Sequence, residues 1–179
     1  MRKVILSEMV TLDCFFAGPN GEIDWHIVDE EFNQYAIDLL NRVDTILFGR
    51  VTYQLFESYW PVAATNPSTS KSDLEIAHKI NNVDKVVFSK TLENTEWKNT
   101  KQIKEIIAEE ILKMKRQPGK NIVIYGSGSI ASTFMNLGLI DDYLLFVNPV
   151  VLGSGKPLFK TSKPGIICCL QTPRRSRAG

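Results

Sequence analysis

Short apolar segments alternate with amphipathic segments along most of this sequence, and this alternation constrains the fold more than any other feature. Strand-length runs rich in Val, Ile, Leu and Phe occupy residues 3–10, 45–48, 85–88, 121–125 and 143–151. Apolar residues recur at helical spacing in residues 29–43, 49–60, 73–81, 103–115 and 129–139. Strands that alternate with helices pair in parallel. We therefore predict an α/β fold with three layers, in which a mainly parallel central sheet has helices on both faces.

The remaining segments indicate where the sheet ends. Residues 95–100 are a candidate for a short edge strand, and residues 166–170 are the last apolar segment. Residues 173–179 contain three arginines, which is typical of a disordered basic tail. A chain of 179 residues has the length of one domain with a full core. We expect a single domain over residues 1–172 with an atypical or shortened C-terminal edge, followed by the tail.

Charge and cysteine content exclude several classes of function. The formal net charge is +1, so no basic surface for nucleic acid or an anionic membrane is expected. No segment approaches the roughly 20 apolar residues that span a bilayer. The three cysteines form no even framework, and Cys168 and Cys169 are adjacent, which favours reduced thiols and a cytoplasmic protein. His26 and His78 have no neighbours at ligand spacing, so no metal site is predicted.

A glycine-rich turn separates the fourth strand candidate from the helix that follows it. The turn and the first apolar residue of the helix are Gly126, Ser127, Gly128, Ser129 and Ile130. A strand, a glycine turn and a helix N-terminus direct backbone N–H groups and a partial positive charge at one point, where a phosphate can bind. The next strand lacks the terminal acid of a standard NAD site. A tight turn with only a structural role is the alternative interpretation.

Small, polar and basic residues that could bind a phosphate also follow two further strand candidates. Gly49, Arg50 and Thr52 follow the second strand and open a helix. Ser89 and Lys90 follow the third strand. The carboxyl ends of parallel strands meet at one edge of an open α/β sheet, which is where ligands bind. The two cations suit a phosphate at this edge, and solvated surface charges are the alternative for both.

A long loop over residues 11–24 follows the first strand and is a second candidate for function. Asp13 lies at its start, where a partly buried carboxylate would hold a substrate amide or hydroxyl, or would handle a proton with an elevated pKa. The alternative for Asp13 is a local turn cap. Phe16 and Trp25 would flank a flat heterocycle, unless they only pack against the loop and core.

Five motifs in this order make the chain resemble the dihydrofolate reductase superfamily, and most closely the branch with the C-terminal reductase domain of bifunctional riboflavin-biosynthesis proteins. They are residues 11–14 (TLDC), 49–53 (GRVTY), 88–91 (FSKT), 126–129 (GSGS) and 141–159. The resemblance covers about residues 3–159. Cys14 stands where the family usually has glycine.

The resemblance implies an NADPH-dependent reductase that transfers a hydride to a small heterocycle, either pterin-like or like an aminopyrimidine precursor of riboflavin. It implies cofactor contacts for Ala17, Gly49, Arg50, Thr52, Ser89, Lys90, Gly126, Ser127, Gly128, Ser129 and Ile130. Ser89 and Lys90 would lie near the adenosine 2′-phosphate. A homodimer is a further implication. The alternative function class is a nucleotide-binding or regulatory protein without catalysis on the same fold.

Overall fold

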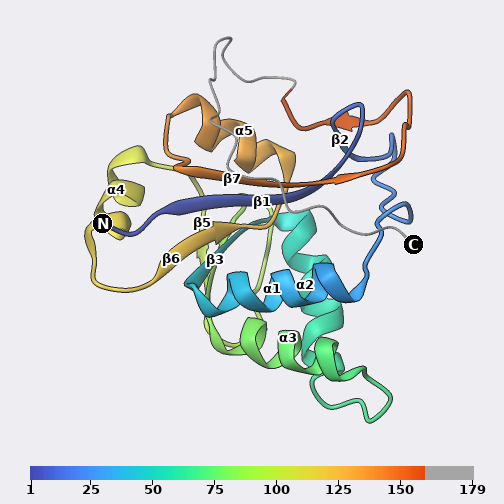
Figure 1. Ribbon diagram of the computed structural model, residues 1–179. Helices are drawn as coiled ribbons and strands as arrows, with labels where there is room; N and C mark the ends of the chain where they lie inside the picture. Colours follow the sequence, from blue (N-terminus) through green and yellow to red (C-terminus); the bar gives the residue numbers. More distant parts are fainter. Residues whose placement is uncertain (160–179) are drawn as a thin grey trace.

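Six parallel strands form the central sheet in the computed structural model, which describes residues 1–159 (Figure 1). Their order is β5–β4–β3–β6–β1–β7, and every neighbouring pair is parallel. The strands are β1 (Val4–Thr11), β3 (Val43–Gly49), β4 (Asp84–Phe88), β5 (Thr100–Ile103), β6 (Asn121–Ile124) and β7 (Asp142–Asn148). The predicted α/β fold with a mainly parallel sheet is therefore confirmed.

Several expectations concern the C-terminal part of the chain and lie outside the described residues. They are the strand at residues 166–170, the basic tail at 173–179 and the end of the predicted domain 1–172. Among residues 1–159, β7 is the edge strand on that side of the sheet.

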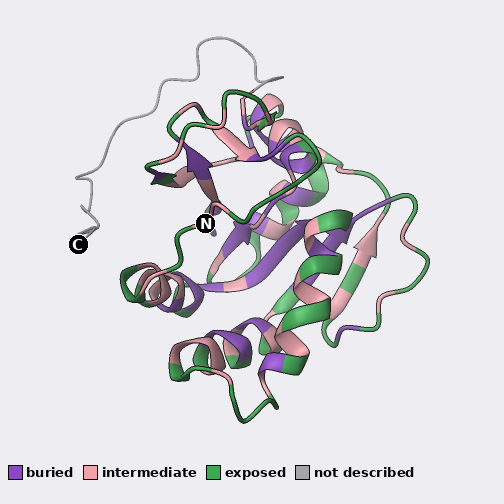
Figure 2. Ribbon diagram, turned by 90° about the vertical axis from the view of Figure 1, so that its right-hand side faces the viewer, coloured by how far each residue is buried: buried purple, intermediate pink, exposed green. Residues whose placement is uncertain are grey.

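Helices cover both faces of the sheet (Figure 1). The helices are α1 (Glu30–Asn41), α2 (Arg50–Ala63), α3 (Lys71–Asn82), α4 (Ala108–Arg116) and α5 (Gly128–Asn136). One apolar cluster joins α1, α2 and α3 to the sheet, and a second joins α4 and α5 to the opposite face. Strand alternation supplies both clusters, because Ile5 of β1 lies in the first and Leu6 in the second. Figure 2 shows the inner strands of the sheet mainly as buried, whereas the edge strands β5 and β7 are mostly of intermediate exposure.

Several elements differ from the predictions. The strand β5 begins at Thr100, instead of occupying residues 95–100, and α4 begins at Ala108, because Ile103 still belongs to β5. The helix α2 continues past Pro61 to Ala63, since a proline in the last turn removes only one hydrogen bond. The expected loop also contains β2 (Phe15–Ala17), which pairs antiparallel with β8 (Lys156–Pro157).

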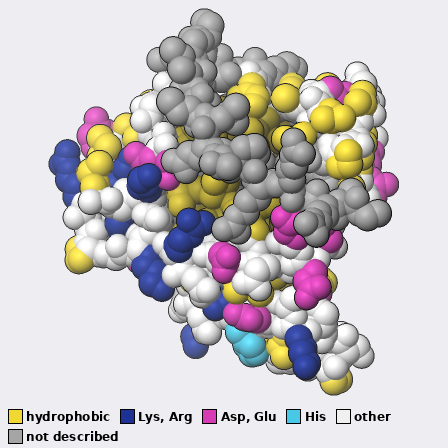
Figure 3. All heavy atoms as spheres, in the orientation of Figure 1, with side chains coloured by type: hydrophobic (Ala, Val, Ile, Leu, Met, Phe, Trp, Pro, Cys, Tyr) yellow, Lys and Arg dark blue, Asp and Glu magenta, His cyan; other side chains and the backbone are white. Residues whose placement is uncertain are grey.

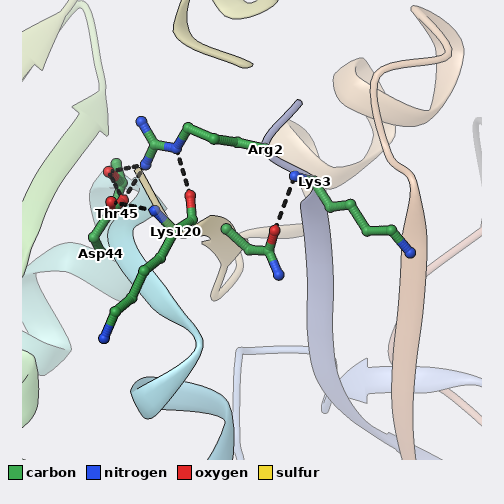
Figure 4. Close-up of polar contacts among 6 residues, drawn as sticks. Arg2, Lys3, Asp44, Thr45 and Lys120 are labelled. Atoms are coloured by element: carbon green, nitrogen blue, oxygen red, sulfur yellow. Dashed lines mark hydrogen bonds and ion pairs between the residues drawn. The ribbon is translucent and has the colours of Figure 1, made fainter. Parts of the chain in front are cut away.

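A polar network fixes the amino ends of β1, β3 and β6 (Figure 4). The buried guanidinium of Arg2 pairs with the Asp44 carboxylate, donates to the Thr45 hydroxyl over 2.7 Å and donates to the Lys120 carbonyl over 2.5 Å. The Lys120 N–H donates to Asp44 Oδ2 over 2.7 Å. These contacts set the three strands in register at one end of the sheet, and so determine which residues meet at the other end.

Lys85 is a buried charge in the core that closes the C-terminal end of α3. Its Nζ donates to the carbonyl oxygens of Ile80, Asn81 and Val83 over 2.8–3.1 Å and lies 4.6 Å from the centre of the Trp97 ring. Burial lowers the pKa of Lys85 to about 8. The side chain therefore satisfies carbonyl groups that the end of a helix leaves open.

Replacing Lys85 by methionine tests this role. Lys85→Met keeps the length of the side chain but leaves buried carbonyl groups without a donor, so we expect a loss of about 2 kcal/mol or more in the free energy of unfolding. Urea denaturation measures it. The exposed Lys98→Met variant is the control, with an expected change within about 0.5 kcal/mol. Equal stabilities of the two variants would contradict the capping role.

Candidate functional site

The glycine turns after β3 and β6 lie against each other at the carboxyl edge of the sheet. The two strands are neighbours, and the Gly49 N–H donates to the Gly126 carbonyl oxygen over 3.1 Å. A Cβ on Gly49 would lie 2.3 Å from Ser127 Oγ, so only glycine permits this approach. Gly126 has a φ of +52°, the left-handed conformation that glycine adopts readily. The structure thus brings two of the predicted turns together.

Two helix N-termini begin from these turns. Gly49 caps α2 and Ser127 caps α5, and neither contributes a side-chain hydrogen bond to the first turn of its helix. The Ser127 and Ser129 hydroxyls instead pair with each other over 2.9 Å. First-turn N–H groups and the positive ends of two helix dipoles therefore face one edge of the sheet. This arrangement suits an anion such as a phosphate.

The predicted cations lie at the rim of this edge. Arg50 is exposed and donates to Gln54 Oε1 over 3.1 Å. Lys90 is also exposed and forms an ion pair of 2.8 Å with Glu105. The Lys90 hydrogen bond holds the pKa of the Glu105 carboxyl below its ordinary value. No pattern in the sequence predicts that Glu105 lies beside Lys90.

Two other predicted cofactor residues are buried. Ser89 Oγ accepts hydrogen bonds from the Thr91 and Leu92 N–H groups over 3.1 and 2.9 Å, so it caps the turn after β4. Ala17 lies in β2, paired with Lys156. Both residues shape the backbone of the site in this structure.

Asp13 joins the first loop to the loop after β7. Its carboxylate accepts hydrogen bonds from Thr11 Oγ1 over 2.6 Å, from the Gly153 N–H over 2.7 Å and from the Leu152 N–H over 3.3 Å. The Thr11 hydrogen bond is the main cause of a lowered pKa of Asp13. The expected elevated pKa was therefore wrong, because these donors stabilise the charged form.

The predicted aromatic pair has two different surroundings. Phe16 packs on the first turn of α5, where its Cε1 lies 2.5 Å from the position of a Cβ on Gly128. Trp25 packs edge-on against His26, with ring centres 4.4 Å apart, and its Nε1 donates to the Glu22 carbonyl over 3.2 Å. Gly128 thus makes room for an aromatic ring as well as for the turn.

Glu8 is a functional candidate that the sequence analysis missed. It lies on β1 opposite Leu145 of β7, and its Oε1 is buried without a hydrogen-bond partner among the described residues. A Cβ on Gly126 would lie 3.2 Å from this Oε1 and 2.7 Å from Thr52 Oγ1, so both oxygens face the Gly126 turn. Burial raises the pKa of Glu8 to about 8, and the neighbouring backbone of Gly126 partly offsets this effect. Its signal in the sequence was a single acid within an apolar strand.

A second set of buried polar atoms lies near the first loop and α1. Within residues 1–159, His26 Nε2 and the Tyr35 hydroxyl are buried without a hydrogen-bond partner. Tyr35 packs against Phe146 of β7, with ring centres 4.3 Å apart, and burial raises its pKa. Burial raises the pKa of Tyr125, next to the Gly126 turn, as well. Buried polar atoms without a partner are candidates for bonding a ligand.

The described residues contain no group of three or more His, Cys, Asp or Glu side chains that could hold a metal ion. The helices in this part of the chain are too short or too polar to cross a membrane. Basic and acidic side chains lie among one another on the face in Figure 3.

The sheet order and the helices on both faces define a three-layer α/β protein with a parallel central sheet. The chain belongs to the RibD C-terminal domain family, whose profile matches residues 2–166. It is 44% identical over 158 residues to the uncharacterized protein YyaP of Bacillus subtilis (strain 168), an alignment that covers 88% of this chain and 80% of YyaP.

Solved structures agree with the fold. A crystal structure of a candidate riboflavin biosynthesis protein from Shewanella sp. PV-4 superposes with a TM-score of 0.62 at 21% identity, over 88% of this chain and 82% of that one. A diaminohydroxyphosphoribosylaminopyrimidine deaminase/5-amino-6-(5-phosphoribosylamino)uracil reductase from Thermotoga maritima gives 0.60 at 16% identity, over 92% of this chain and 50% of that one.

Cys14 carries a backbone strain that a stability measurement detects. Its φ is 63°, and hydrogen bonds from the Cys14 N–H to the Thr11 carbonyl and from the Leu158 N–H to the Cys14 carbonyl hold it there. Because glycine adopts this conformation freely, Cys14→Gly should raise the free energy of unfolding by about 1 kcal/mol. Urea denaturation compares it with Cys14→Ala, which keeps the strain. If the glycine variant is no more stable than the alanine variant, the strain is absent.

Glu8 should make stability fall with rising pH. The carboxyl binds a proton more tightly in the folded chain, with a pKa of about 8, than in the unfolded chain, near 4.5. The contribution is therefore fully present below pH 4.5 and lost as the pH rises through 8. Glu8→Gln should flatten the profile between pH 5 and 9 and exceed the parent in stability at pH 9.

Urea denaturation at pH 5, 7 and 9 measures this profile. Glu110→Gln on the exposed face of α4 is the matched control and should follow the parent. Parallel profiles for the parent and Glu8→Gln would show that Glu8 ionises normally in the folded protein.

Proposed function

We propose that this protein is an NADPH-dependent reductase that transfers a hydride to a small heterocycle, either pterin-like or like an aminopyrimidine precursor of riboflavin. The observation that carries the proposal is the meeting of two glycine turns with two helix N-termini at the ends of β3 and β6. The family supports it, and so does the reductase named in the Thermotoga maritima structure. Cytoplasmic location and a homodimer belong to the same proposal.

The residues present fit the diphosphate of a dinucleotide. A Cβ at Gly49 or Gly126 would lie within 2.7 Å of a neighbouring side-chain oxygen, so these glycines let backbone and hydroxyl donors lie close together. First-turn N–H groups of α2 and α5, together with the Thr52 hydroxyl, would hold the diphosphate. The bound cofactor would supply the hydride.

Arg50 and Lys90 would bind the adenosine 2′-phosphate. Both are exposed cations at the ends of adjacent strands, and each has a partner that a phosphate can replace at low cost. The ion pair of Lys90 with Glu105 is solvent-exposed, and such pairs contribute little. A phosphate with two negative charges is the stronger partner for a lysine.

The substrate would lie beside the first loop, against Trp25, His26 and Tyr35. The buried polar atoms of His26 and Tyr35 are ready to bond a ring nitrogen or carbonyl, and the aromatic rings supply flat apolar contacts. Asp13 would act by holding the first loop in place through the Gly153 N–H. Phe16, on the first turn of α5, would close the side nearest the cofactor.

Cofactor selectivity is the first test. Lys90→Gln should weaken NADPH binding on the order of tenfold or more and leave NADH unchanged, because one charge-assisted contact contributes roughly 1.5–3 kcal/mol. Glu105→Gln frees Lys90 and should leave NADPH binding equal or tighter. Calorimetric titration measures the NADPH and NADH dissociation constants of the parent and of each variant, with the exposed Lys113→Gln on α4 as control. Equal losses for NADPH and NADH in Lys90→Gln would contradict the 2′-phosphate contact.

Catalysis is tested by the oxidation of NADPH with pterins and with aminopyrimidine ribosides as acceptors. Acceptor-dependent loss of NADPH absorbance is the expected result. Tight NADPH binding without oxidation by either class would favour the non-catalytic nucleotide-binding alternative.

A further inference from the structure

Glu8 is a partly buried acid whose Oε1 is fully buried, and the strand around it does not require a charged group at this position. Leu6 and Val10, on the same face of β1, are core residues, and an apolar side chain at position 8 would continue their row. The carboxyl instead places an unpartnered oxygen in the interior, which destabilises a fold unless another group bonds to it. Such exceptions concentrate at functional sites.

The position of this carboxyl relates it to the phosphate cradle, by which we mean Gly49, Thr52, Gly126 and the first turns of α2 and α5. Glu8 Oε1 and Thr52 Oγ1 lie 3.2 and 2.7 Å from the same point beside Gly126. Gly126 is also the residue whose carbonyl joins the two turns. A charge on Glu8 would therefore lie next to the turn from which the N-terminus of α5 begins.

We propose that Glu8 is the proton-controlled member of the phosphate cradle, so that the cradle accepts the diphosphate of a dinucleotide while Glu8 is protonated and rejects it once Glu8 is ionised. The identity of the ligand class rests on the proposed function, whereas the role of Glu8 requires only an anion at the Gly126 turn. Two negative groups this close in a buried environment repel strongly. By linkage, a bound diphosphate must also hold the proton on Glu8 more tightly.

The groups around Glu8 leave it as the main candidate for such titration. On its face of the sheet lie Ile124 of β6 and Tyr143 and Leu145 of β7. Gly126 follows β6 and lies next to the Glu8 carboxyl. Thr52 of α2 lies at the turn, and α5 packs apolar residues on this face. Tyr143 is the titratable side chain among these neighbours. Arg50, the nearest charge on α2 in sequence, is exposed and bonded to Gln54.

The test uses ADP-ribose and NADPH as probes on the full chain, between pH 6 and 9.5. The diphosphate of ADP-ribose keeps its charge across this range, and the probe carries no nicotinamide. For the parent protein we expect a nearly constant dissociation constant below pH 7 and a rise approaching tenfold per pH unit above pH 8. Glu8→Gln keeps the size of the side chain without the ionisation, so its dissociation constant should change much less. Glu110→Gln should follow the parent.

Calorimetry in buffers of different ionisation enthalpy adds a readout that needs no variant. Binding of ADP-ribose to the parent at pH 9 should take up close to one proton per ligand, and Glu8→Gln should take up none. A parent that binds without proton uptake at pH 9 would overturn the role of Glu8, whether or not the variant folds. So would a Glu8→Gln variant with the parental pH dependence.

The outcomes separate this inference from the proposed function. Proton-linked binding of ADP-ribose without oxidation of NADPH by any acceptor would support the proposed role of Glu8 and contradict the proposed reductase activity. NADPH oxidation with pH-independent binding supports the reductase and removes the role of Glu8. Failure of both probes to bind at pH 6 removes both.

Discussion

The parallel register of β1, β3 and β6 is the constraint on which the rest of the site depends. The Arg2 network holds the three strands at their amino ends, and each strand then carries its last residues to the same edge (Figure 4). There the hydrogen bond from Gly49 to Gly126 closes the two turns against each other. A shift of one residue in β1 would turn Glu8 to the opposite face, and a shift in β3 or β6 would separate the two turns.

Unsatisfied polar atoms indicate where the fold gives up stability for function. Four buried side-chain atoms lack a hydrogen-bond partner within residues 1–159, and three of them belong to Glu8, His26 and Tyr35. Glu8 comes from β1, His26 from the segment between β2 and α1, and Tyr35 from α1. The buried Lys85 is the contrasting case, because its ammonium group donates hydrogen bonds to three carbonyl oxygens. The fourth unsatisfied atom, Thr100 Oγ1, lies at the start of the edge strand β5, away from the site.

The first loop owes its shape to the last described part of the chain. Asp13 accepts hydrogen bonds from Leu152 and Gly153, and β2 pairs with β8. Cys14 is held at a positive φ between these contacts. The loop is therefore a fixed wall of the site. The Asp13 carboxylate joins this loop to the loop after β7. That use explains why the pKa of Asp13 falls below its ordinary value, where a proton donor would need the reverse.

The sequence by itself determined the alternation of strands and helices, and with it the fold class. It also determined that Gly49 and Gly126 would follow buried strands, because periodicity and glycine are local properties of the chain. That both turns meet at one edge follows from parallel pairing alone. The predicted bounds of β5 and α4 were wrong because the local signals there are weak. The predicted end of α2 was wrong because the helix tolerates the one hydrogen bond lost at Pro61.

Only the tertiary structure decided which side chains act together. Glu105 lies beside Lys90, Gly153 beside Asp13, and Phe16 on Gly128, and each pairing joins separate elements. The burial of Glu8 depends on β6 and β7, which begin more than a hundred residues later in the chain. A residue's pKa and partners are set by such distant neighbours, and the spacing of residues along one segment contains no information about them.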